Sequence, residues 1–429
     1  MDSITLQNYR CFGSEEQTAR LAPLTLLVGP NSTGKTSFLA LIRALWDVAF
    51  REVVPNFREE PFDLGSFEDI VHQKAGRNSA AQHFSGRFEL CPPFATSDEM
   101  LRFTATFASW QTAPFPIVRA YSDGNVSLEL SATKSRDGER SRFRIGQGVW
   151  QDVGKEMVMH QSDGLVSLEF LDRLPPVVFG DDDDNLRRFL VGMRVPKMVL
   201  PRPFAGAPVR SRPRRTYDPM LLAHDAEGDS IPSYLANVSR RRADEWQLLK
   251  GGLEGFGQTS GLFDEISVRS FGKSDGDPFQ IQIRKFGKRR KGPWRNLIDV
   301  GYGVSQALPV LVEMLRPDAA GMLLLQQPEV HLHPQVQAAL GTFFCEVAAG
   351  GRQLVVETHS DYIIDRVRMD VRDGTTRLNP EDVSILYFEP GDLDVKIHSI
   401  RIDQAGNVLD APLSYGKFFM AETRRSIGL

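Results

Sequence analysis

The chain has 429 residues, of which 41% are hydrophobic and 25% are charged; this suits two or three globular domains and excludes a disordered or disulfide-knot class. Its 51 Lys and Arg against 55 Asp and Glu leave a net charge of −4, so the overall charge does not indicate nucleic-acid binding. The three cysteines are widely separated without CxxC spacing, which excludes a zinc ribbon. No apolar run reaches the roughly 18 residues of a membrane span, and no leader pattern opens the chain. We therefore expect a cytoplasmic protein with no membrane contact.

A phosphate-binding loop is predicted near the N-terminus. Residues 24–28 form an apolar run typical of a buried strand, and apolar residues recur at helical spacing from Phe38 onward. Between them, residues 29–36 match in full the pattern GxxxxGK followed by Ser or Thr. In this order of strand, glycine-rich loop and helix, backbone N–H groups can surround phosphate oxygens, Lys35 can reach the outer phosphates, and Thr36 can offer a hydroxyl to Mg²⁺. The sequence therefore predicts a nucleotide site.

The middle of the chain is patterned differently from both ends. Residues 85–180 contain short β-like runs separated by turn residues, residues 186–260 carry helical patterning, and residues 266–286 return to strand-like alternation. A basic run at residues 284–291 is followed by Trp294 and Arg295. It is interpreted either as a solvated hairpin tip or as a contact for nucleic acid or an acidic partner, and both interpretations stay open.

The last third of the chain alternates helices and strands. We expect helices near residues 306–315, 335–347 and from about 361, and strands at residues 321–325, 353–356, 383–388 and 395–402. Such alternation predicts a parallel sheet that helices cover on both faces.

Polar residues at two of these strand ends are candidates for action on a nucleotide. The first strand runs into Gln326, Gln327 and Glu329, at a place where hydrolysis would need an acid for Mg²⁺ and a carboxylate to activate water. The strand at 353–356 runs into His359, which could contact a γ-phosphate. A glycine-rich turn at residues 299–306 opens another helix, and a second phosphate-facing turn makes sense if it completes the site of a neighbouring protomer.

Taken in order, these motifs resemble those of ABC-type ATPase heads of the Rad50/SMC-like group. They resemble more closely the stand-alone ATPases of the overcoming-lysogenization-defect (OLD-like) class, also described as AAA-15 or AAA-21. The resemblance is carried by residues 8–12 (NYRCF), 328–334 (PEVHLHP) and 357–360 (ETHS). It covers residues 1–75 and 296–402 well and the middle poorly.

The resemblance implies an α/β fold, namely a P-loop NTPase with an ABC-ATPase-type head, a mixed sheet flanked by helices, and a β-rich and helical insertion. We divide the chain accordingly into three parts. These are an N-terminal ATPase lobe with the Walker A motif (1–85), an insertion or arm (86–295), and a C-terminal ATPase lobe with signature-like, Walker B-like and switch-histidine motifs (296–429).

The resemblance also implies cofactors, site residues and an assembly. ATP and Mg²⁺ are the expected cofactors, and the nucleotide-binding residues are Gly29, Asn31, Ser32, Thr33, Gly34, Lys35, Thr36, Ser37 and Arg10. Thr36 and Gln73, a Q-loop candidate, are expected near the metal ion. Gly301, Gly303 and Ser305 stand in for a signature loop that acts in trans, so a homodimer or higher homo-oligomer is expected to form through the ATP sites.

The chain departs from its relatives where hydrolysis takes place. In related heads the positions of Gln326 and Gln327 usually include an acid, and an amide can orient water but cannot accept its proton. Three explanations stay open: slow turnover with Glu329 as the surviving carboxylate, a natural ATP-binding switch, or an engineered substitution. We expect slow ATP hydrolysis, with Glu329, Gln326, Gln327 and the switch histidine His359 as catalytic candidates.

ATPases of this kind commonly accompany a separately encoded nuclease or toxin in two-gene bacterial anti-phage systems (PARIS-like). The sequence carries no TOPRIM-like acidic cluster, so we expect an ATP-dependent switch, sensor and scaffold for a separate effector such as a nuclease. The alternative is a DNA-repair or chromosome-maintenance ATPase that binds DNA directly, with residues 284–295 as the contact. A transporter subunit is disfavoured by the large insertion and the weak signature.

Overall fold

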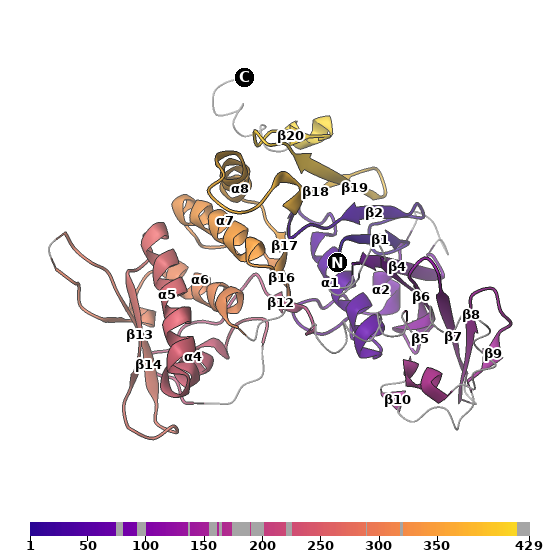
Figure 1. The fold of residues 1–429 in the computed structure, drawn as a ribbon, viewed down its shortest axis with the longest axis horizontal. Coiled ribbons are helices and arrows are strands. Elements are labelled where there is room, and N and C mark those ends of the chain that lie inside the picture. Colours follow the sequence, from indigo (N-terminus) through magenta and orange to yellow (C-terminus); the bar gives the residue numbers. More distant parts are fainter. Residues whose placement is uncertain are drawn as a thin grey trace.

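The structure of the protein is a computed structural model. It describes residues 1–73, 80–91, 100–135, 138–153, 161–162, 165–173, 189, 201–219, 225–288, 290–317 and 321–417. Figure 1 shows an antiparallel sheet from the first third of the chain on one side, a second sheet with its helices in the centre, and a small helical and β unit on the other side. Among the described residues, no helix is long and apolar enough to cross a membrane.

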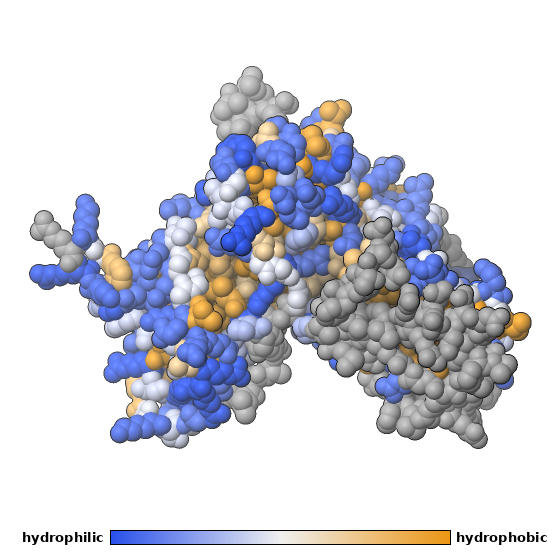
Figure 2. Space-filling view, viewed as in Figure 1, coloured by the Kyte–Doolittle hydropathy of each residue, from blue (hydrophilic) through white to orange (hydrophobic). Residues whose placement is uncertain are grey.

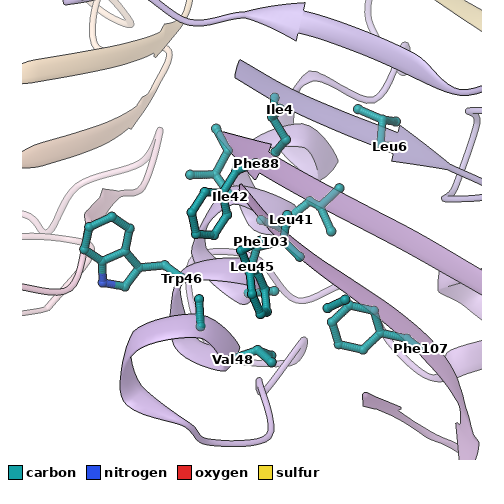
Figure 3. Close-up of a cluster of buried hydrophobic side chains, with 14 of the residues drawn as sticks. Ile4, Leu6, Leu41, Ile42, Leu45, Trp46, Val48, Phe88, Phe103 and Phe107 are labelled. Carbon is teal, nitrogen blue, oxygen red and sulfur yellow. The ribbon is translucent and has the colours of Figure 1, made fainter. Parts of the chain in front are cut away.

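The first sheet is antiparallel and has the strand order β2-β1-β4-β5-β6-β7-β8-β9. Its strands are β1 (Ser3–Gln7), β2 (Gln17–Arg20), β4 (His83–Leu90), β5 (Leu101–Trp110), β6 (Ala113–Ser122), β7 (Ser127–Ser135), β8 (Gly138–Ile145) and β9 (Gln151–Asp152). Every second residue of β4 is buried, as the period of two in a strand requires when one face is covered. Figure 3 shows Phe88, Phe103 and Phe107 of this sheet beside Leu41 and Leu45 of the first helix.

The second sheet is mixed and has the strand order β12-β16-β17-β3-β18-β19-β20. Its strands are β12 (Phe204–Gly206), β16 (Met322–Gln326), β17 (Gln353–Glu357), β3 (Leu24–Val28), β18 (Val383–Pro390), β19 (Val395–Ile402) and β20 (Val408–Leu409). The strands from β12 to β18 pair in parallel, and β19 and β20 add antiparallel edges. The prediction of an α/β head with a mixed sheet flanked by helices is therefore confirmed.

Helices cover both faces of the mixed sheet. They are α1 (Lys35–Trp46), α6 (Tyr302–Leu315), α7 (Pro334–Ala349) and α8 (Asp361–Asp373). Short helical segments elsewhere in the described chain are Asp47–Arg51, α2 (Phe67–Ile70), Leu168–Arg173, Leu297–Asp299 and Pro380–Asp382. Leu27 and Val355 pack in the hydrophobic cluster that contains α1, whereas their neighbours Leu26 and Val356 pack in the cluster that contains α6, α7 and α8. Both faces are thus buried, which explains why β3 and β16 are apolar at nearly every position.

A third unit contains α4 (Ile231–Arg241), α5 (Ala243–Ser260) and the strands β13 (Glu265–Ser270), β14 (Phe279–Arg284) and β15 (Arg295–Asn296). Its buried side chains, among them Phe256 and Ile281, belong to the same cluster as α6 and α7. A two-strand pair, β10 (Gln161–Ser162) with β11 (Leu165–Val166), completes the described elements. The unit therefore extends the helical side of the mixed sheet.

Two features of the middle region differ from the sequence-based description. The boundary at residues 85/86 falls inside β4, which pairs with β1 through residues 85–89, so the strands that follow continue the N-terminal sheet. Helical patterning was predicted over 186–260; among the described residues of this range, the helices are α4 and α5 over 231–260, and residue 189 is also helical. The described residues 201–219 are extended and contain β12, because prolines at 201, 203, 208 and 213 oppose a helix there. Residue 186 and most of its neighbours lie outside the described residues.

Candidate functional site

The phosphate loop, residues 29–36, connects β3 to α1 as predicted. Gly29, Ser32 and Gly34 have φ values of 141°, 62° and 86°, and these left-handed positions turn successive backbone N–H groups inward, which creates a cradle for an anion. The Lys35 Nζ donates hydrogen bonds to the Gly29 carbonyl at 3.0 Å and to the Pro30 carbonyl at 2.7 Å. The lysine is therefore folded over the loop, where its charge faces the space in front of the cradle.

A cavity of about 810 Å³ opens in front of this loop, which is a volume typical of small-molecule sites. It is lined by Arg10, Cys11, Asn31, Ser32, Thr33, Gly34, Lys35, Thr36, Ser37, Asp69, Val71, His72, Gln73, Gln327, Glu357 and Leu393. Burial lowers the pKa of Lys35, an effect that the charge of Glu357 opposes. A roomy cavity with a buried cation beside an anion cradle fits the polyphosphate of a nucleotide.

The N-terminal segment 8–12 forms one wall of the cavity. The Arg10 guanidinium donates to the Asp69 carbonyl at 2.8 Å, and the Tyr9 hydroxyl donates to the Ser37 carbonyl at 2.9 Å. Gly34 lies so close that an added Cβ would be 2.5 Å from the Cys11 Sγ. The first sheet is thereby fixed to the start of α1, and Arg10 lies within reach of a nucleotide.

The predicted Q-loop residue Gln73 also lines the cavity. Its side-chain amide donates to the Glu68 carbonyl at 2.7 Å and is exposed. The structure thus brings Gln73 to the same cavity as Thr36, from an independent segment of the chain.

The two glutamines at the end of β16 have different environments. Gln326 is 5% exposed, and its Nε2 has no hydrogen-bond partner within the described part of the chain. Gln327 has φ 40°, donates its backbone N–H to the Glu357 carbonyl at 2.8 Å and lines the cavity. Gln327 therefore faces the cavity directly, while the Gln326 side chain is buried at the carboxyl end of β16.

The structure adds a site residue that sequence reasoning missed, namely Glu357 at the end of β17. The Thr36 hydroxyl donates to its Oε2 at 2.8 Å, and the side chain is 5% exposed although it lines the cavity. A signal was present in the sequence, since Glu357 is the first polar residue after an apolar strand that precedes His359. Its approach to Thr36 depends on β17 lying directly beside β3.

Glu329 lies behind the cavity and is not among the residues that line it. Its Oε1 accepts hydrogen bonds from the Thr358 hydroxyl and from the His359 backbone N–H, both at 2.8 Å. Burial is the main cause that raises the pKa of Glu329, while the bonds from His359 and Thr358 oppose the rise. Its observed contacts are therefore those of an acceptor that holds the loop after β17.

His359 follows in that loop and is half-buried. Burial lowers its pKa and the nearby charge of Lys35 lowers it further, which favours the neutral imidazole, whose one ring nitrogen donates and the other accepts a hydrogen bond. The next residue, Ser360, caps α8 by accepting from the Ile363 N–H at 3.2 Å. The loop that carries His359 is thus fixed on both sides.

The glycine-rich turn, residues 301–305, lies at the N-terminus of α6 and does not line the cavity of its own chain. Gly301 is exposed, and a Cβ added there would have nothing within 4 Å. Close behind it, Ser305 is buried and donates to the Tyr302 carbonyl at 2.8 Å. Gly301 is therefore the exposed residue of this turn, and none of Gly301, Gly303 and Ser305 lines the cavity at the phosphate loop.

The basic run lies on the hairpin between β14 and β15, which projects from the molecule as a hydrophilic arm in Figure 2. Arg284 and Lys291 both contact Glu265, and the Lys285 ammonium donates to the Gly261 carbonyl. The Arg284 guanidinium also lies 4.2 Å from the centre of the Trp294 ring. Arg289 lies outside the described residues. These contacts partly neutralise the run.

Comparisons with known proteins agree with this architecture. A family model described as "AAA ATPase domain" matches residues 1–140, and one described as "AAA domain, putative AbiEii toxin, Type IV TA system" matches residues 207–365. The OLD nuclease of Thermus scotoductus is 24% identical over 406 residues, which cover 91% of this chain and 64% of that protein. The chain thus spans slightly less than two thirds of the length of this relative.

The fold is also similar to a solved structure. The crystal structure of an SMC head bound to the C-terminal winged-helix domain of ScpA superposes with a TM-score of 0.50 at 12% identity, covering 94% of this chain and 98% of that chain. At this identity the similarity concerns the fold alone.

Proposed function

We propose that this chain, which is similar to AAA ATPase domains and to an OLD nuclease, binds ATP with Mg²⁺ in the cavity at the phosphate loop and acts as an ATP-dependent switch. The observation that carries the proposal is the cavity of about 810 Å³ in which the loop backbone, Lys35 and Thr36 face the same space as Arg10 and Gln327. Loop N–H groups and Lys35 would hold the phosphates, and the Thr36 hydroxyl would face Mg²⁺, with Gln73 lining the same cavity.

The proposal places the ATP between two copies of the chain. In support, the signature-like turn at residues 301–305 opens a helix whose N-terminus is exposed and does not line the cavity of its own chain. A helix N-terminus attracts anions, so the turn of a second copy can complete the nucleotide site. Closure of two copies over ATP would then be the conformational signal.

Hydrolysis is proposed to be slow. Gln327 faces the cavity but its amide cannot accept a proton from water, and Glu329 is engaged with Thr358 and His359. Positioning and electrostatic stabilisation by Lys35 and the loop would remain, so ATP binding is retained while the chemical step lacks its base. His359 is not among the residues that line the cavity, so its contact with the nucleotide stays a prediction.

The output is proposed to be control of a separately encoded nuclease or toxin in anti-phage defence, in the cytoplasm. The curated relative is named a nuclease and one matching family is described with a type IV toxin–antitoxin system, which supports an effector of this kind. Direct action on DNA is less favoured, because two cations of the basic hairpin are already paired with Glu265.

A plaque assay in the native host tests this role. We expect a strain that carries the Lys35→Ala variant to be as sensitive to phage as a deletion strain, because this variant lacks the cation that would face the phosphates. The control is Lys250→Ala, which removes a surface ion pair with Glu254 of little energetic value and should protect like the wild type. Equal plating on wild-type, Lys35→Ala and deletion strains would contradict the defence role.

A further inference from the structure

The cavity contains little negative charge of its own. Among its described lining residues only Asp69 and Glu357 are acids. Asp69 is exposed and its Oδ2 already accepts from the backbone N–H and the hydroxyl of Ser66, at 2.8 and 2.7 Å. Glu357 is 5% exposed, and its Oε2 accepts from the hydroxyl of Thr36 at 2.8 Å. One buried carboxylate thus lies against the hydroxyl expected at the metal ion.

The strand order explains how Glu357 reaches this position. β17 lies between β16 and β3, and Glu357 is in register with Gln326 on one side and with Leu27 on the other. Glu357 is therefore one strand nearer to the phosphate loop than Gln326. The Gln326 amide can supply no negative charge, and its Nε2 is without a partner in the described structure.

We propose that Glu357 supplies the carboxylate on the Mg²⁺ side of the bound nucleotide, the role for which Gln326 lacks the charge. Mg²⁺ in nucleotide sites takes one or two carboxylates together with phosphate oxygens and waters, and Thr36, Glu357 and the phosphates provide such a set. The inference rests on the proposed nucleotide site and adds to it the identity of the acid. Glu357 either contacts the ion or accepts from a water bound to it.

Other carboxylates are less suited to this role. Glu329 holds Thr358 and His359 through Oε1 and does not line the cavity. The described residues contain no group of three or more His, Cys, Asp or Glu side chains that could hold a metal ion without a ligand. A site of one carboxylate and one hydroxyl should therefore bind the ion mainly together with ATP.

Metal and nucleotide binding of purified protein test the inference. The probes are Mn²⁺, followed by electron paramagnetic resonance in the presence of a non-hydrolysable ATP analogue, and ATP titrated calorimetrically with Mg²⁺ or with EDTA. We expect Glu357→Gln to weaken Mn²⁺ binding by roughly 10- to 100-fold, as for other residues that support a metal site. Its ATP affinity in EDTA should equal that of the wild type, because Gln can still accept from Thr36.

Two further variants make the result specific. Glu346→Gln changes the same residue type on the exposed surface of α7 and should leave Mn²⁺ binding unchanged. The double variant Gln326→Glu with Glu357→Gln returns a carboxylate one strand away and should recover part of the Mn²⁺ affinity. Wild-type Mn²⁺ binding by a folded Glu357→Gln protein would overturn the inference alone. Absence of ATP binding by the wild type, with or without Mg²⁺, would overturn the nucleotide site itself.

Discussion

At the level of single residues, the two glutamates that follow β16 and β17 perform different tasks. Glu357 lines the cavity, and its Oε2 accepts a hydrogen bond from the Thr36 hydroxyl. The Glu329 Oε1 instead accepts from the backbone N–H of His359. The sequence places both acids at strand ends, and it singled out Glu329 because that residue belongs to the PEVHLHP motif. The two glutamates differ in their hydrogen-bond partners. Those partners lie on other segments of the chain, so the order of residues in the sequence does not predict them.

The role of Glu329 can be tested by two substitutions. In Glu329→Gln the amide oxygen still accepts from Thr358 and His359, so we expect nearly unchanged ATP turnover. Glu329→Ala leaves two buried donors unpaired, which should cost roughly 1 to 3 kcal/mol of unfolding free energy and should lower turnover because His359 is no longer held. Turnover abolished by Glu329→Gln in a fully stable protein would instead identify Glu329 as the general base.

The pH dependence of stability provides an independent check on Glu329. Burial raises its pKa above the ordinary value of 4.5, so the folded protein holds this proton more tightly than the unfolded chain. The contribution of protonated Glu329 to the free energy of unfolding is complete below pH 4.5, and it is lost as the pH rises through the raised pKa. Denaturant titrations should therefore show wild-type stability declining relative to Glu329→Gln over this window, and a constant difference would contradict the buried position.

At the level of elements, local sequence patterns predicted individual strands and helices, whereas pairings between distant strands could not be predicted. The strand, loop and helix around residues 24–46 were predicted because an apolar run, glycines and helical spacing are local patterns. The strands and helices of the last third were also found near their predicted positions. The three-residue strand β12 was missed because its partner β16 is more than 100 residues away. The pairing of β1 with β4 is likewise non-local, so the extent of the first sheet could not be predicted.

The contact between the phosphate loop and the N-terminal segment gives a prediction at this scale. Gly34 has φ 86°, and a Cβ would meet Cys11 and the Phe12 ring at 2.5 and 3.0 Å. Gly34→Ala should therefore lose ATP binding and destabilise the protein by about 2 to 4 kcal/mol, from backbone strain and overpacking together. The control Gly251→Ala lies in α5 with nothing within 4 Å of the added atom. It should be neutral or stabilising by up to about 1 kcal/mol. Equal melting temperatures for both variants would contradict this packing.

At the level of the whole molecule, the mixed sheet and its helices form a head in which the signature-like turn does not line the cavity at the phosphate loop. The similarity to an SMC head, with a TM-score of 0.50, agrees with the fold predicted from the motifs. The sequence could not place Gly301 relative to the cavity, because this depends on where α6 packs against the sheet. The position of the turn outside this cavity is what makes a second copy necessary for a complete site in our account.

The most direct test of this account is the mass of the purified chain in solution, measured by light scattering with and without Mg²⁺-ATP. We predict that ATP doubles the mass of 48.0 kDa, that Lys35→Ala neither binds ATP nor dimerises, and that Gly301→Arg binds ATP but stays monomeric. Gly255→Arg, a matched change at an open position of α5, should dimerise like the wild type. A mass that ATP leaves unchanged, or a Gly301→Arg protein that still dimerises, would contradict the account.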